Sequence, residues 1–129
     1  MVLGNGANTF GGYGSIVEIQ SGVLSVGTVG ALGNAGNVVM LNPASGSTAV
    51  LRVTGDMSLG GAAQRLAFGA LSAMDVRRIE VVAGKTLTLD GAIEVSMAPG
   101  APFSKYEAGT LVLGQAWDAY TGVITVNQG

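Results

Sequence analysis

The sequence contains no cysteine and no histidine. Without cysteine the fold has no disulfide, no thiol nucleophile and few of the ligands that build structural zinc sites. Without histidine it lacks the most frequent general base and metal ligand of enzymes. The two absences together favour a protein that is not an enzyme and that holds no metal or cofactor.

Charged residues are also scarce. They make up 11% of the 129 residues, and the net charge is −2. The six basic residues are scattered, apart from the pair Arg77-Arg78, so no positive face is available for phosphates. No apolar run approaches the ~18 residues of a membrane helix, and no signal peptide is recognisable. We therefore expect neither nucleic-acid binding nor membrane insertion, and we expect any targeting signal to lie outside these residues.

Aromatic residues are few, with three Phe, three Tyr and one Trp, whereas 22 residues are glycine and 48% are hydrophobic. This composition is too apolar for a disordered chain and too rich in glycine for a helical bundle. Brief runs of Val, Leu, Ile and Thr between single glycines predict many strands of about 4–7 residues with tight corners. A core filled by small aliphatic residues suits a narrow coil of strands better than a two-sheet sandwich.

Alternation of apolar and polar residues predicts strands at 14–21, 23–26, 49–53, 57–60, 79–82, 86–89 and 109–114. Residues 62–75 have a partly helical pattern that Gly69 interrupts, and we interpret them as a loop with one helical turn or as an irregular strand. Pro99 and Pro102 mark 97–103 as a loop or an edge. The residues expected to point inward are Val2, Ile16, Leu24, Val26, Val38, Met40, Val50, Leu59, Ile79, Val81, Leu87, Leu89, Ile93, Leu111, Leu113 and Val126.

The last stretch of the chain repeats the first. Residues 1–22 and 111–129 both begin with an apolar triplet and a glycine, MVLG and LVLG. Both continue with an Asn or Asp two residues before an aromatic residue and with a second glycine, and both end in an alternating strand, IVEIQSG and VITVNQG. Self-similarity at a long period is typical of stacked repeat architectures. We expect residues 1–129 to form a single segment of such a stack.

The repeat resembles a known pattern. Residues 109–126, GTLVLGQAWDAYTGVITV, are similar to the autotransporter-associated β-strand repeat, as are GANTFGG at 6–12 and VAGKTLTLDG at 82–91. The chain departs from that pattern at Asp118-Ala119, where the family favours Asn-Thr, and at 62–75. The resemblance implies a right-handed parallel β-helix in an exported protein, secreted or on the bacterial cell surface. It brings no catalytic residues.

The predicted fold is thus all-β, a right-handed β-solenoid. At roughly 20 residues per rung and ~4.8 Å between rungs, the chain would supply about five to seven rungs. The first and last rungs would present unpaired backbone groups to a second copy, in a head-to-tail contact that builds a fibre rather than a ring. The residues expected at these assembly ends are Met1, Val2, Leu3, Val123, Ile124 and Val126.

Three functions compete. The leading hypothesis is a structural stalk or self-assembling fibre, which has itself as partner. The alternative is an adhesin that binds a glycan or a surface protein through its outer face, with Trp117 and Tyr120 as the aromatic contacts. An enzyme acting on polysaccharides would use the charged residues of a groove, and the candidates are Asp75, Arg77, Arg78, Glu80, Asp90 and Glu94. Alternating charged residues on a strand more often form its solvated face.

Overall fold

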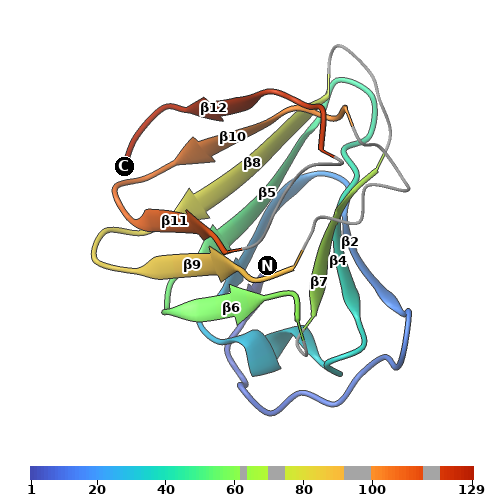
Figure 1. The fold of residues 1–129 in the computed structure, drawn as a ribbon. Helices are drawn as coiled ribbons and strands as arrows, with labels where there is room; N and C mark the ends of the chain where they lie inside the picture. Colours follow the sequence, from blue (N-terminus) through green and yellow to red (C-terminus); the bar gives the residue numbers. More distant parts are fainter. Residues whose placement is uncertain (62–63, 70–74, 92–99, 115–119) are drawn as a thin grey trace.

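A computed structural model describes residues 1–61, 64–69, 75–91, 100–114 and 120–129. The chain is all-β, and its strands stack as a β-solenoid of about four turns (Figure 1). Every strand pairing among these residues is parallel. The predicted class, an all-β parallel solenoid, is confirmed.

Three sheets surround a common interior (Figure 1). Sheet A has the order β1-β3-β5-β8-β10-β12, and sheets B and C have the orders β2-β4-β7 and β11-β9-β6. The strands of sheet A are β1 (Val2–Leu3), β3 (Gly22–Val26), β5 (Thr48–Val53), β8 (Val76–Val81), β10 (Phe103–Tyr106) and β12 (Ile124–Val126). Those of sheet B are β2 (Ile16–Ile19), β4 (Val38–Leu41) and β7 (Arg65–Phe68), and those of sheet C are β6 (Met57–Leu59), β9 (Thr86–Leu89) and β11 (Thr110–Leu113).

Each turn of the coil passes through sheets B, A and C in that order, as in β4, β5 and β6 and then in β7, β8 and β9. In the first turn the short 3-10 helix η1 (Val29–Leu32) takes the place of a strand of sheet C and lies against β6. In sheet A, Val23 pairs with Val50 and Val50 with Arg78, which are offsets of 27 and 28 residues. The turns are therefore longer than the 20 residues assumed from the sequence, which explains why the chain completes fewer of them.

The core consists of columns of aliphatic side chains that run along the coil. Leu24, Leu51 and Ile79 occupy paired positions of sheet A, and all three are buried. Sheet B contributes the column Ile19, Leu41 and Phe68, and sheet C contributes shorter columns, among them Leu59 and Leu89. These residues form one apolar cluster. Since each column extends from one turn to the next, an open turn at either end exposes apolar side chains.

Of the sixteen residues expected to point inward, seven lie in the main cluster: Leu24, Val26, Leu59, Ile79, Val81, Leu87 and Leu89. The prediction is wrong for Val2 and Ile16, which are exposed, because the neighbouring Leu3 and Val17 point inward in the opposite phase. Val38 and Met40 are buried in a separate small cluster with Ala67, and Val50 is buried outside both clusters. Leu111, Leu113 and Val126 occupy inward columns but remain partly or largely exposed at the last turn, and Ile93 lies outside the described residues.

Within 62–75 the described part contains strand β7 of sheet B, so one of the two interpretations of this segment, an irregular strand, holds for these residues. The two copies of the sequence repeat lie in different sheets. Strand β1 of the first copy lies in sheet A, whereas β11 of the second lies in sheet C. Strand β2 lies in sheet B, whereas β12 lies in sheet A. We call each of the three sheets one face of the coil. Each strand of the second copy therefore lies one face further along the path of the coil than its counterpart.

Candidate functional site: the two ends of the coil

Large apolar side chains that remain exposed gather at the two ends of the coil. Those near the N-terminal end are Met1, Val2, Phe10, Tyr13, Ile16 and Val23, and those near the C-terminal end are Val112, Leu113, Val123 and Val126. Val76 is the one remaining large apolar residue that is exposed within the described ranges. Clustered exposed apolar surface marks interaction sites in soluble proteins. The ends of the coil are therefore the candidate functional sites.

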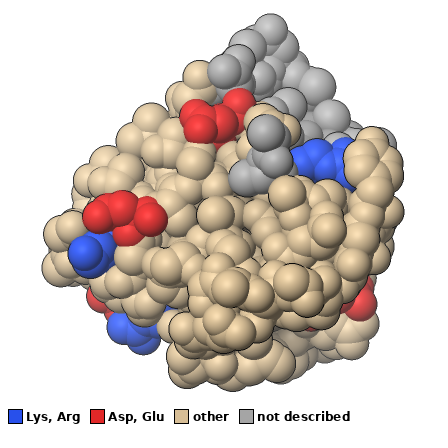
Figure 2. Space-filling view, turned by 90° about the horizontal axis from the view of Figure 1, so that it is seen from below, with Lys and Arg blue, Asp and Glu red and all other residues tan. Residues whose placement is uncertain are grey.

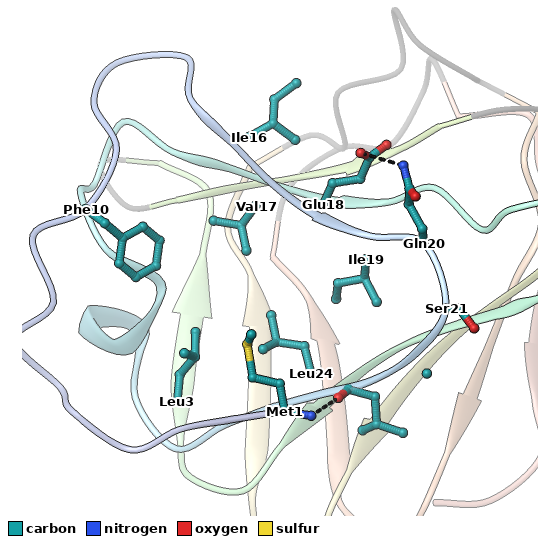
Figure 3. A pocket seen from close by; sticks show the side chains of 12 residues that line it. Met1, Leu3, Phe10, Ile16, Val17, Glu18, Ile19, Gln20, Ser21 and Leu24 are labelled. Atoms are coloured by element: carbon teal, nitrogen blue, oxygen red, sulfur yellow. Dashed lines mark hydrogen bonds between the residues drawn. The ribbon is translucent and has the colours of Figure 1, made fainter.

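The N-terminal end forms an open hollow of about 580 Å³. Leu3, Phe10, Val17, Ile19 and Leu24 point into it (Figure 3). It exists because β1 begins sheet A one turn before β2 begins sheet B, so the interior between them has no covering strand. The floor of the hollow is the start of the aliphatic columns.

This end of the molecule carries few charges: the Met1 ammonium donates to the Val23 carbonyl at 2.8 Å, the Arg65 guanidinium lies 5.9 Å from the Tyr13 ring, and Glu18 lies on β2. Glu18 is the first charged residue of the sequence, and the next is Arg52. The Glu18 carboxylate accepts hydrogen bonds from the side-chain amides of Gln20 and Asn42, at 2.9 and 2.5 Å. In the view from below, the charged side chains lie around the margin and the middle of the face is uncharged (Figure 2). Little electrostatic work is needed to bring an apolar partner against such a surface.

The C-terminal end forms a smaller hollow of about 240 Å³. Leu111 and Leu113 of β11 line one side, and Ile124 and Val126 of β12 line another. In each strand, one outward-facing residue separates the two lining residues. Both strands therefore present their inward side chains to the opening. The two hollows are thus alike in construction, because strands from two adjacent sheets bound each of them.

Lys105 lies beneath the C-terminal hollow, with 2% of its surface exposed. Its Nζ donates hydrogen bonds to the backbone carbonyls of Glu107, Gly109 and Gln128, the last at 2.8 Å. Burial lowers the pKa of the Lys105 ammonium, and the nearby Glu107 carboxylate opposes that shift. All three N–H donors of the ammonium are therefore satisfied, and they join the last two turns of the coil.

Backbone N–H and C=O groups on the outermost strands point away from the coil. In β12, the Phe103 N–H donates to the Val123 carbonyl and the Asn127 N–H donates to the Lys105 carbonyl. Because successive residues of a strand alternate in direction, the peptide groups of Ile124 and Val126 face the free edge. The same reasoning places those of Leu111 and Leu113 on the free edge of β11, since Thr110 and Gly114 donate to β9 or its flanks.

The N-terminal strands also have free edges. In β1, the Ser25 N–H donates to the Met1 carbonyl, so the peptide groups of Val2 face outward. In β2, the carbonyls of Ser15 and Ile19 accept from the second turn, so those of Ile16 and Glu18 face outward. Among the described residues, β1 and β2 at one end and β11 and β12 at the other therefore carry peptide groups on a free edge, and such edges pair readily with another chain.

The six residues expected at the assembly ends divide as follows. Met1, Val2, Val123 and Val126 are exposed. Leu3 and Ile124 are partly buried and pack on the core. The structure thus places all six in or beside the outermost strands of sheet A.

The predicted aromatic contact surface is not assembled by the described residues. Tyr120 is partly buried, its ring lies about 6 Å from those of Phe68 and Phe103, and its hydroxyl donates to the Ala101 carbonyl at 2.8 Å. Burial raises the pKa of Tyr120 to about 12, and Arg77 opposes the shift. Trp117 lies outside the described residues. Tyr120 therefore belongs to the apolar packing of the coil.

The charged residues weighed for catalysis are dispersed among several structural contacts. Asp75 and Arg77 form a buried ion pair at 3.9 Å, and Arg77 also donates twice to the Gly69 carbonyl, at 3.2 and 2.6 Å. Burial lowers the pKa of Arg77, whereas Asp75 raises it. Because these contacts link Gly69, which follows β7, to the start of β8, the pair suits a structural role there.

The other candidates lie on the outer faces. Glu80 pairs with Arg52 at 3.9 Å and with Arg78 at 3.8 Å on sheet A. The Asp90 carboxylate accepts a hydrogen bond from Ser58 on sheet C, and Glu94 lies outside the described residues. Within the described ranges, no group of three or more acidic residues is placed to hold a metal ion.

No family model matches this sequence, and comparisons with curated proteins and with solved structures find no significant match. Within the part of the chain that the structure describes, no helix is both long and apolar enough to cross a membrane.

The sequence reasoning did not identify Arg77 and Lys105 as buried residues. Both occupy inward positions of sheet A, where they follow aliphatic residues of earlier turns: Ala49 pairs with Arg77, and Ile79 pairs with Lys105. A signal was present at 103–106, FSKY, where Phe103 and Lys105 alternate with Ser104 and Tyr106. Identifying this segment as a strand would have placed the lysine on the same face as the phenylalanine.

Proposed function

We propose that this chain is a structural β-solenoid segment, a stalk or fibre subunit, that lengthens by end-to-end stacking of its coil. The observation that carries the proposal is the concentration of exposed apolar side chains at both ends, each with an open hollow. The mechanism is mechanical: backbone hydrogen bonds between turns and continuous aliphatic columns give a stiff rod.

Stacking accounts for both surface features at once. A second copy on the C-terminal end covers Leu113 and Val126, which belong to inward columns but are 42% and 63% exposed. It also gives partners to the outward peptide groups of the edge strands. Burial of apolar surface stabilises such a contact by roughly 25 cal/mol per Å² before the cost of association is deducted.

The proposal includes a right-handed coil, because crossovers between parallel strands are right-handed in about 98% of cases. It also places the protein outside the cell, secreted or on a bacterial surface, in keeping with the sequence resemblance. No residue is assigned a catalytic role.

Negative-stain electron microscopy of the purified chain over a range of concentrations tests the proposal. We expect filaments one coil wide whose length increases with concentration. Monomers at every concentration would contradict it.

Val126→Pro tests whether the free edge is responsible. The Val126 N–H faces away from β10, so proline removes a free-edge donor and leaves the donors that hold β12 to β10. We expect shorter filaments from V126P than from V126A, the matched control that keeps the N–H. Equal lengths would exclude strand pairing as the contact.

A further inference from the structure

The one-face displacement of the sequence repeat determines how a second copy can stack. After β12 in sheet A, the path of the coil leads to sheet C, where β11 has a free edge. Gly129 lies against the corner that leads into β11, because a Cβ built on Gly129 would be 2.6 Å from the Gly109 carbonyl oxygen and 2.9 Å from that of Glu107. The next strand position of the stack is therefore on β11.

We infer that a second copy stacks on the first after a rotation by one face of the coil, so that its β1 pairs with β11 and its β2 pairs with β12. This inference rests on the proposed end-to-end assembly and specifies its register. Each strand then lies on its own counterpart in the sequence repeat: MVLG on LVLG, and IVEIQSG on VITVNQG.

The inward and outward phases agree across this contact. In the first pair of strands, Leu3 points inward, as does Leu113, while Val2 and Val112 lie between the inward residues of their strands. In the second pair, the inward residues are Val17 and Ile19 of one copy and Ile124 and Val126 of the other. The aliphatic columns therefore continue from one copy into the next.

The backbone donors and acceptors of the first pair also agree. The Val2 peptide groups face outward from β1, and those of Leu111 and Leu113 face outward from β11. With Val2 opposite Val112, the Val2 N–H donates to the Leu111 carbonyl, and the Leu113 N–H donates to the Val2 carbonyl. This is the ordinary bonding pattern of a parallel pair.

The second pair of strands bonds in the same way. With Glu18 opposite Thr125, the Glu18 N–H donates to the Ile124 carbonyl, and the Val126 N–H donates to the Glu18 carbonyl. The Glu18 carboxylate then has Thr125 as its neighbour on the outer face, and no charged residue opposes it there.

The local backbone supports the equivalence of the two copies. Gly22 follows Ile19 by three residues and has φ +79°, and Gly129 follows Val126 by three residues and has φ +103°. Both glycines lie in the left-handed region that disfavours a side chain. The two copies therefore share a left-handed glycine three residues after the last inward residue of the strand.

Stacking without rotation is less favourable. It places β1 of the second copy on β12, where Val2 would continue the outward column Ser25, Arg52, Glu80 and Tyr106 and lie beside Asn127. In that arrangement β1 of the second copy occupies β12 and leaves the free edge of β11 without a strand partner from β1 or β2. Rotation by one face pairs β1 and β2 of one copy with β11 and β12 of the other.

Engineered cysteines distinguish the two registers, and the natural chain has no cysteine to interfere. Paired residues of neighbouring strands are about 4.8 Å apart, within the range that a disulfide spans. We expect the double variant V2C/V112C to form filaments and, on oxidation, to give a ladder of disulfide-linked multimers on a non-reducing gel. The double variant V2C/N127C forms filaments but remains monomeric on the same gel.

Both substitutions of the test variant are at exposed positions, so the core is unchanged. A mixture of the single variants V2C and V112C gives a mixed disulfide that peptide mass analysis identifies. Filaments in which V2C/N127C cross-links, or in which neither pair does, overturn the rotated register and leave end-to-end assembly intact. Absence of filaments under all conditions overturns both proposals.

Discussion

Lys105 pairs with Ile79 in sheet A and continues the inward column Leu24, Leu51 and Ile79. A lysine thus follows three aliphatic residues in that column, and only Val126 of the last strand lies beyond it. Its ammonium is stable there because three carbonyls from two successive corners accept hydrogen bonds from it. One of these, the Gln128 carbonyl, comes from the segment that follows β12. The charge inside the coil therefore holds the last turn in place.

Replacing Lys105 with methionine should loosen the last turn. Methionine keeps the apolar stem but leaves the carbonyls of Glu107, Gly109 and Gln128 without their donor. Hydrogen bonds to charged groups contribute about 1.5–3 kcal/mol, so we expect the free energy of unfolding to fall by about 2–3 kcal/mol. Hydrogen exchange should accelerate in β12 and remain slow in β5.

The other lysine of the chain provides the control. Lys85 is 41% exposed in its side chain and forms a surface ion pair with Asp56 at 3.9 Å. Lys85→Met should change the free energy of unfolding by less than about 1 kcal/mol. Equal losses for the two variants, measured by chemical denaturation, would show that Lys105 has no special structural role.

The buried pair of Asp75 and Arg77 predicts that the free energy of unfolding depends strongly on both residues. Arg77→Met leaves the Asp75 carboxylate buried without its ion pair and removes two hydrogen bonds to the Gly69 carbonyl. Breaking a buried pair in this way costs about 3–5 kcal/mol. The double variant R77M/D75L, which removes the carboxylate too, should regain part of that loss.

The neighbouring Arg78 is the matched control for Arg77. It lies on the outer face, pairs with Glu80 at 3.8 Å and stacks on the Tyr106 ring at 4.1 Å. Arg78→Met should cost about 1 kcal/mol. If R77M proved no more destabilising than R78M in thermal or urea unfolding, the buried pair would not determine stability.

The sequence predicted the strands well where apolar and polar residues alternate cleanly. In Thr86-Leu87-Thr88-Leu89 only one set of alternating residues is apolar, so only that set can point inward. Leu87 and Leu89 are buried as expected. In Ile16-Val17-Glu18-Ile19 both phases contain apolar residues, and the inward phase is the one without the glutamate. In Val38–Leu41 all four residues are apolar and buried, so alternation carries no information on the phase.

The ends of the coil were only partly predictable. Self-similarity identified the strands at both ends, since it depends on local sequence. It did not show that the copies lie one face apart, because this depends on the number of turns between them and hence on corner lengths. The role of Lys105 was hidden for a related reason: its acceptors at Glu107, Gly109 and Gln128 come together only after the coil has formed.

Tyr120 predicts a loss of stability at alkaline pH. Its pKa is about 12 in the folded chain and about 10 in the unfolded chain. The unfolded state therefore releases the phenolic proton first, and the stabilisation present below pH 10 is lost as the pH rises towards 12. Between pH 9 and pH 11 the loss should be about 1 kcal/mol.

Tyr120→Phe isolates this effect, because Lys105 titrates in both proteins and cancels in the comparison. At pH 8 the variant should be less stable by about 1 kcal/mol, since the hydrogen bond to the Ala101 carbonyl is lost. The difference between the proteins, measured by urea denaturation, should shrink as the pH rises to 11. A difference independent of pH would contradict the raised pKa.

The close stacking of corners predicts which glycines tolerate a side chain. A Cβ on Gly55 would lie 2.0 Å from the Gly27 carbonyl oxygen of the preceding turn, whereas one on Gly12 would meet no atom within 4 Å. Neither residue has a positive φ, so backbone strain does not separate them. Because the obstacle at Gly55 is backbone, Gly55→Ala must push two turns apart and should cost about 1–3 kcal/mol. Gly12→Ala should remain within about 0.5 kcal/mol of the parent. Equal thermal stability of the two variants would mean that the turns are not packed at the distance that places Gly55 against Gly27.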